Sequence, residues 1–185
     1  MQIKKFNLPL TENDIINLKA GDIIEITGTI YTARDAAHKR LISLINENKE
    51  LPIDLNDATI YYTGPTPKKE HEVIGVAGPT SSYRMDEYTL PLLKKGLKIM
   101  IGKGPRNDYI KEYLKEYKAL YLSAIGGAAV IISKCIKRCD IVCYEDLGTE
   151  AIYKLEVENM HLIVTYDIYG NDLFLDGIKK FQEDI

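Results

Sequence analysis

The sequence predicts a single α/β domain, residues 1–185, in which helices flank a mixed sheet. Apolar, β-branched runs alternate along the chain with stretches of helical periodicity, which is typical of strands that alternate with helices. A chain of 185 residues fits one domain with a substantial core. No internal repeat, low-complexity tract or shift in composition divides the sequence.

The first quarter of the chain shows three elements. After a few residues that alternate in polarity, Thr11 and Asp14 have capping-box spacing, which predicts a short helix that ends at Gly21. Residues 22–30 are rich in isoleucine and predict a strand. Apolar residues at helical spacing predict a helix over residues 34–48.

The middle of the chain continues the alternation, with glycine or proline at most junctions. We expect a strand over residues 59–63, a turn at 64–67 and a second strand over 72–77. A helix over 85–95, a strand over 97–101 and a helix over 107–115 follow.

The last part of the chain predicts a mixed set of elements. An apolar run predicts a strand over residues 119–124, and small residues at helical spacing predict a helix over 126–137. Alternating patterns predict strands over residues 140–144, 162–166 and 173–175. The segment Tyr169-Gly170-Asn171-Asp172 has the composition of a hairpin turn between the last two strands.

Composition and charge exclude several classes of protein. The net charge of −3 and the pI of about 5.7 argue against sequence-independent binding of nucleic acid, which needs a basic surface. No apolar run is long enough to cross a membrane. The first residues lack the apolar core of a signal peptide, so we expect a cytoplasmic protein. Three cysteines in such a protein do not suggest a disulfide framework.

Two predicted junctions between a strand and a helix each carry an arginine. At the first, Thr32 is the candidate N-cap and Arg34 lies beside Asp35; at the second, Arg84 lies at the helix start. A cation there opposes the helix dipole, so a negative group must compensate, either a carboxylate such as Asp35 or a bound anion. Because the arrangement occurs twice, we favour a small-anion site.

The loop before Arg84 could complete such a site. Gly78 allows the backbone to approach a ligand, and the hydroxyls of Thr80, Ser81 and Ser82 could bind an oxyanion. The alternative is an ordinary turn in which Ser81 or Ser82 caps the next helix. A third junction, Gly102-Lys103-Gly104, lacks the spacing of a P-loop.

The carboxyl ends of strands in α/β sheets gather ligands. We therefore expect Arg34, Thr80, Arg84 and Lys103 to converge there. His38 is one helical turn after Arg34, and we expect a structural histidine, with a hydrogen bond to the anion or to Asp35 as the alternative. The three cysteines are not expected to form a metal site, because a helix and a strand would separate them (Cys135, Cys139 and Cys143).

These motifs resemble the class I, iron-sulfur fumarases. The resemblance rests on Ala33-Arg34-Asp35-Ala36-Ala37-His38, Gly78-Pro79-Thr80, Arg84-Met85-Asp86, Gly102-Lys103-Gly104 and Leu147-Gly148-Thr149-Glu150-Ala151, in that order. It covers nearly the whole chain and fits the β subunit of the two-subunit form or the C-terminal domain of the single-chain form. The β subunit of L-tartrate dehydratase is a similar relative.

The resemblance implies a swivelling β/β/α domain that closes over a partner α subunit. The partner would carry a [4Fe-4S] cluster on its own cysteines, and this chain alone would bind none. An α2β2 assembly is implied, with a β–β homodimer possible.

The resemblance also assigns roles to residues. Thr80 takes the place of the catalytic base, and the substrate carboxylates would be bound by Arg34, Arg84 and Lys103. Lys103 is a second candidate for the base, because desolvation beside two arginines would lower its pKa. The residues expected to support these groups are Asp35, His38, Gly78, Ser81 and Asp86.

The implied activity is the reversible hydration of fumarate to (S)-malate. One alternative is the dehydration of tartrate to oxaloacetate. A second alternative is a non-catalytic assembly domain that binds small anions.

Overall fold

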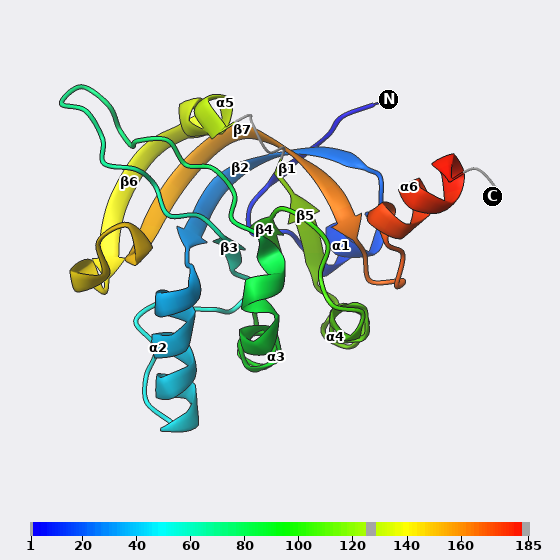
Figure 1. Ribbon diagram of the computed structural model, residues 1–185, viewed down its shortest axis with the longest axis horizontal. Helices are drawn as coiled ribbons and strands as arrows, with labels where there is room; N and C mark the ends of the chain where they lie inside the picture. The colour runs from blue at the N-terminus through cyan, green and yellow to red at the C-terminus, as the bar shows by residue number, and fades with distance from the viewer. Residues whose placement is uncertain (1, 125–128, 183–185) are drawn as a thin grey trace.

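The computed structural model describes residues 2–124 and 129–182 and shows an α/β fold with a mixed sheet flanked by helices, as predicted (Figure 1). The strands are β1 (Lys4–Asn7), β2 (Ile23–Thr32), β3 (Thr59–Tyr61), β4 (Ile99–Gly102), β5 (Leu120–Ser123), β6 (Ile136–Cys143) and β7 (Ile152–Tyr166). The helices are α1 (Glu12–Ile16), α2 (Asp35–Asn46), α3 (Asp86–Lys94), α4 (Tyr109–Tyr117), α5 (Ala129–Cys135) and α6 (Leu173–Phe181), with 3-10 segments η1 (Ser82–Met85) and η2 (Glu145–Glu150).

The sheet order is β1-β2-β3-β4-β5-β7-β6, and β7 also pairs with β2. Strands β1 to β5 are parallel, whereas β7 runs antiparallel to β2, β5 and β6. The second pairing of β7 joins β2, β3, β4, β5 and β7 into a barrel-like ring. Adjacent parallel strands β2, β3 and β4 therefore end at one edge of the sheet.

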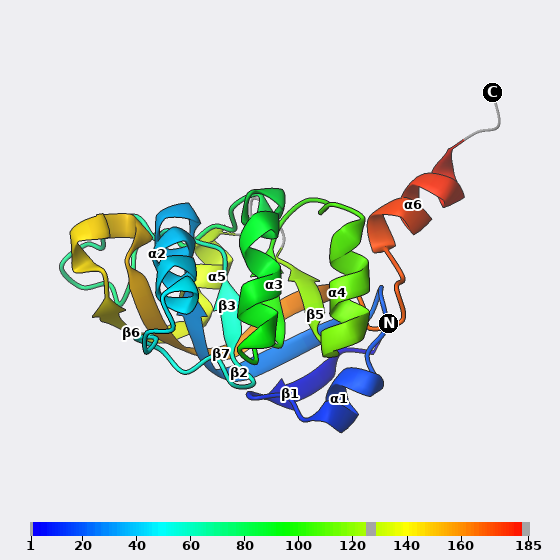
Figure 2. The ribbon, with the colours of Figure 1, turned by 90° about the horizontal axis from the view of Figure 1, so that it is seen from below.

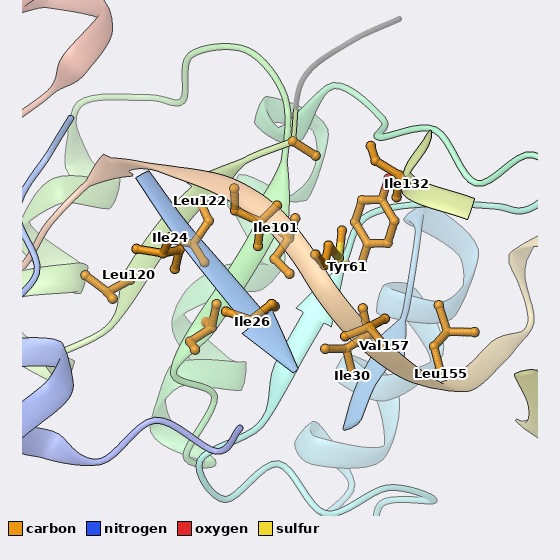
Figure 3. Packing of buried hydrophobic residues seen from close by; sticks show 14 of the residues in the cluster. Ile24, Ile26, Ile30, Tyr61, Ile101, Leu120, Leu122, Ile132, Leu155 and Val157 are labelled. Atoms are coloured by element: carbon orange, nitrogen blue, oxygen red, sulfur yellow. The ribbon is translucent and has the colours of Figure 1, made fainter. Parts of the chain in front are cut away.

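The core consists of two buried clusters, because side chains along the central strands point alternately to the two faces of the sheet. In β4, Ile99 and Ile101 join one buried cluster while Met100 joins the other. Residues on alternate positions of a strand point to opposite faces, so a strand that is apolar throughout must be covered on both faces. Figure 3 shows side chains of the first cluster, which include Ile24, Ile26, Leu122 and Val157.

The second cluster packs the sheet against three helices. Figures 1 and 2 both show α2, α3 and α4 side by side on one face of the sheet. Their buried side chains, such as Leu41, Leu92 and Leu114, belong to the same cluster as Ile60 and Tyr121 of the strands. Helix α2 begins close to the carboxyl end of β2, whereas a loop and η1 separate α3 from β3.

Two predicted strands are wrong. Residues 72–77 form a loop, in which Val76 bonds to Thr66 (Thr66 N to Val76 O, 3.0 Å) rather than to the sheet. Leu173 begins helix α6 and not a strand, because the Asp172 carboxylate caps the N–H groups of Phe174 and Leu175. The predicted hairpin turn over residues 169–172 consequently joins a strand to a helix.

Two other boundaries differ from the prediction. The predicted helix over 126–137 begins outside the described residues and gives way to β6 at Ile136. β7 begins ten residues before the predicted 162–166 strand, at Ile152. Its alternation is interrupted at Asn159, where φ is +52°, and this interruption hides the strand in the sequence pattern.

None of the helices in residues 2–124 and 129–182 combines the length and apolar character that a membrane crossing requires.

Candidate functional site

Arg34 lies at the N-cap position of α2, directly after β2, with an extended backbone and no capping bond from its own side chain. Its guanidinium has two acidic neighbours: Nε is 3.9 Å from Asp35 Oδ2, and Nη2 is 3.5 Å from Glu150 Oε1. Thr32, the predicted cap, lies within β2, where its hydroxyl contacts Ala151 O and Tyr153 N. That prediction is wrong because the helix begins two residues later than a cap at Thr32 requires.

Arg84 reaches the same carboxylate from the second junction. Its Nη2 lies 2.9 Å from Asp35 Oδ2, so Asp35 lies between the two guanidinium groups. The side chains remain accessible, with Arg34 exposed to 23% and Arg84 to 42%. The structure thus brings together two arginines that are separated by 50 positions in the sequence, as expected from the convergence of strand ends.

Thr80 and Lys103 are joined through their backbones. Lys103 N donates to Thr80 O (3.3 Å), and Ser82 N donates to Lys103 O (3.0 Å), which extends the sheet beyond β4. Thr80 N donates to Tyr62 O (2.7 Å), just after β3. Lys103 is exposed and Thr80 is half-buried. Arg34 and Lys103 come just after β2 and β4, and Thr80 pairs with Tyr62 just after β3. Arg84 is four residues after Thr80. All four predicted groups therefore lie at one edge of the sheet.

Ser82 is a buried link between these loops and does not act as a cap. Its Oγ accepts a hydrogen bond from Lys103 N (3.0 Å) and lies 2.9 Å from the Tyr121 hydroxyl. A Cβ at Gly102 would lie 1.9 Å from Ser82 Oγ, so this contact requires glycine. Ser81 precedes η1 but makes no capping bond, so the alternative in which a serine caps the next helix is not observed.

Gly78 supports the same loop by close packing. Its carbonyl accepts a hydrogen bond from the Thr63 hydroxyl (2.7 Å), and a Cβ at Gly78 would lie 3.1 Å from Ala129 Cβ of α5. A larger residue would push α5 away from the Thr80 loop. Gly78 therefore shapes the loop next to the candidate base.

Asp86 lies behind the site, in a buried ion pair that the sequence did not reveal. Arg106 Nε donates to Asp86 Oδ1 (2.6 Å), and Asn107 bonds to Oδ2 through its backbone and its side chain. Arg106 also donates to the Thr89 hydroxyl (2.6 Å) and lies over the ring of Tyr121. This network joins the start of α3 to the loop that follows Lys103.

His38 is buried beneath the start of α2. Its Nδ1 lies 2.8 Å from the carbonyl oxygen of Arg34, which can only accept, so Nδ1 carries the proton. Its ring stacks on Tyr88 and meets the edge of Tyr62. Burial lowers the pKa of His38 to about 4, and the ring is therefore neutral at pH 7. These contacts are those of a structural histidine.

The free energy of unfolding is expected to fall as the pH is lowered through the His38 range. The unfolded chain binds a proton near the ordinary pKa of 6.5, whereas the folded chain does so only near 4. Acid therefore favours the unfolded state, and the free energy of unfolding is lower by about 2 kcal/mol at pH 5 than at pH above 7. Urea unfolding at several pH values measures this loss. His38→Asn, which keeps a donor near the Nδ1 position, should remove most of it; an equal loss in this variant would rule out His38 as its source.

The three cysteines do not fit a metal centre. Cys135 and Cys139 pack against one core cluster and Cys143 against the other, so the thiols do not converge. Burial raises the pKa of each thiol, to about 11 for Cys143, which disfavours the thiolate that a metal needs. Within the described ranges, no three His, Cys, Asp or Glu side chains form a potential metal site.

Comparison with known proteins shows the family of this chain. Residues 1–177 match the family model described as the fumarase C-terminus. The chain belongs to this family. A putative L(+)-tartrate dehydratase subunit beta from Methanocaldococcus jannaschii is 38% identical over 180 residues, which cover 94% of this chain and 92% of that protein. The L(+)-tartrate dehydratase subunit beta of Escherichia coli K12 is 32% identical over 186 residues, with 97% and 90% covered.

Single-chain relatives are also similar. The anaerobic class I fumarate hydratase of Escherichia coli K12 is 40% identical over 160 residues, which cover 85% of this chain but 29% of that enzyme. A putative class I fumarate hydratase from Geobacillus stearothermophilus is 39% identical, and this chain spans 34% of its length. The named relatives are hydro-lyases, and the resemblance identified from the sequence motifs is confirmed.

Proposed function

We propose that this chain is the β subunit of a hydro-lyase that reversibly hydrates fumarate to (S)-malate in a site shared with an α subunit. One observation carries the proposal most: two arginines share Asp35 at the sheet edge that also presents Thr80 and Lys103. A four-carbon diacid has a carboxylate at each end. The edge offers a separate cation for each of them.

Cations are necessary because a dicarboxylate loses its hydration when it enters an enclosed site. Arg34 and Arg84 can each donate two parallel hydrogen bonds to a carboxylate, and Lys103 adds a compact positive charge. When a proton leaves the carbon next to a carboxylate, negative charge develops there. The cation at that end stabilises this charge in the transition state.

Thr80 is the proposed base that takes this proton from malate and returns it to fumarate. A threonine hydroxyl is a weak base, so its deprotonated form must be favoured by positive charge nearby, which Lys103 and Arg84 supply. The pairing of the Thr80 backbone with the Lys103 backbone supports this assignment, because it joins the two segments that carry these side chains. The lysine amine is the second candidate for the base.

A partner is part of the proposal, since two of the relatives are named as beta subunits. The resemblance to the iron-sulfur fumarases implies a [4Fe-4S] cluster, and we propose that the α subunit carries it on its own cysteines. This chain then supplies substrate binding and proton transfer. The proposed assembly is α2β2, with a β–β contact as the alternative.

Dehydration of L(+)-tartrate is a second candidate function. The relatives named as tartrate dehydratase beta subunits match this chain over 90% or more of their own length, whereas the fumarate hydratases match as parts of longer chains. Tartrate and malate share both carboxylates, so the arginines serve either substrate. Other residues of the shared site would have to bind the additional hydroxyl of tartrate.

The proposal is tested by anaerobic reconstitution. The chain is co-expressed with the α subunit of the same genome, supplied with iron and sulfide, and assayed with fumarate, malate and each tartrate. We expect turnover of fumarate and malate by the assembled enzyme and none by the isolated chain. Turnover of L(+)-tartrate alone would establish the second function. Failure of the assembled, iron-loaded enzyme on every diacid, or hydration by the isolated chain, would contradict the proposal.

A further inference from the structure

Glu150 contacts both the backbone and the side chain at the start of α2. It ends segment η2, between β6 and β7, and its side chain is exposed to 24%. Oε2 accepts a hydrogen bond from Ala36 N (2.9 Å), while Oε1 lies 3.5 Å from Arg34 Nη2. One carboxylate thus holds the helix and the arginine that precedes it.

The contact of Glu150 with Ala36 compensates an unfavourable positive charge at the start of this helix. The first N–H groups of a helix have no partner within it, and they favour negative charge. Arg34 is at the N-cap position, makes no capping bond and brings a positive charge instead. Glu150, from a segment 114 positions away, supplies both the missing acceptor and the compensating charge.

Arg34 is also confined on another side. A Cβ at Gly64 would lie 3.0 Å from Arg34 Cδ, 3.1 Å from Nη1 and 2.8 Å from Thr149 O. The arginine therefore packs between the Gly64 backbone and the segment that ends at Glu150. Its Nε–H, which is buried, has no hydrogen-bond acceptor among the described residues. The guanidinium is held in place by these contacts, and the Arg34 side chain is still exposed to 23%.

We propose that Glu150 is a positioning residue that orients Arg34 toward one carboxylate of the substrate. This inference rests on the proposed function and adds to it that the two arginines have different roles. Arg34 is the fixed end of the diacid site, enclosed and paired with Glu150. Arg84 is more exposed, pairs with Asp35, and adjusts to the other carboxylate.

The test measures diacid binding as well as turnover by the assembled αβ enzyme. Succinate, a four-carbon diacid that cannot react, is titrated calorimetrically into wild type and Glu150→Gln. We expect the variant to raise the Kd of succinate and the KM of malate about tenfold. A change of this size is typical when one of two residues in contact, here Glu150 and Arg34, is replaced. Glu145→Gln removes the same charge from an exposed residue of the same segment and should change both values less than twofold.

A double-mutant cycle separates positioning from a purely structural effect. If Glu150 acts through Arg34, then adding Glu150→Gln to Arg34→Gln changes the Kd of succinate by less than twofold. A full tenfold further loss, or an unchanged Kd in the single variant, would overturn the inference. A wild-type enzyme that neither binds succinate nor turns over any diacid would instead refute the proposed function.

Discussion

Replacing Thr80 by Ala is expected to lower kcat about a thousandfold, because the substitution removes the proposed base. General bases typically contribute two to four orders of magnitude. The hydrogen bonds of Thr80 to Tyr62 and Lys103 use its backbone and are retained by alanine. Assembly with the α subunit should therefore be unchanged, which gel filtration of the complex would show, while steady-state kinetics measure kcat.

Two control variants make this result specific. Ser43→Ala removes an exposed hydroxyl of α2 that has no part in the proposed site and should leave kcat within a few fold of wild type. Thr80→Ser keeps a hydroxyl at the same position and should restore most of the activity. Near-normal turnover by Thr80→Ala would end the assignment of Thr80 as base and favour Lys103.

Asp86→Ala is expected to lower the free energy of unfolding by about 3–5 kcal/mol. The Arg106 side chain is fully buried, and Asp86 is its ion-pair partner at 2.6 Å. Removal of the carboxylate leaves the guanidinium buried without a counter-charge, with the Thr89 hydroxyl and the aromatic rings of Tyr62 and Tyr121 as remaining contacts. Urea unfolding followed by circular dichroism measures the loss.

Asp108→Ala is the matched control for this prediction. Asp108 also pairs with a cation, Lys111, but its side chain is 91% exposed. Exposed ion pairs contribute at most about 1 kcal/mol, so this variant should be nearly neutral. Equal losses in the two variants would show that the buried pair has no special importance for stability.

The sequence predicted the fold class because the central strands are buried on both faces. Continuous apolar runs such as the one around Met100 are typical of strands that are covered on both faces. Prediction failed where tertiary contacts decided the outcome. Residues 72–77 have a strand-like pattern, yet Val76 pairs with Thr66 across the loop. The alternation of β7 is interrupted at Asn159, so its first ten residues were missed.

Candidate site residues could be chosen from the sequence only where a local motif pointed to them. Arginine at a helix start is an electrostatic anomaly that the sequence itself reveals, and it identified Arg34 and Arg84. Glu150 and Arg106 were assigned no role, because their importance comes from partners far along the chain. Neither residue breaks a local rule, so no local pattern could identify them.

The central claim is that one four-carbon diacid is held by Arg34, Arg84 and Lys103 with Thr80 beside it. A crystal structure of the assembled enzyme with bound succinate tests this most directly. We predict one carboxylate within hydrogen-bonding distance of Arg34 and the other bound by Arg84 or Lys103, with Thr80 Oγ1 facing a methylene carbon. Succinate bound away from this edge of the sheet, or in contact with neither arginine, would contradict the account.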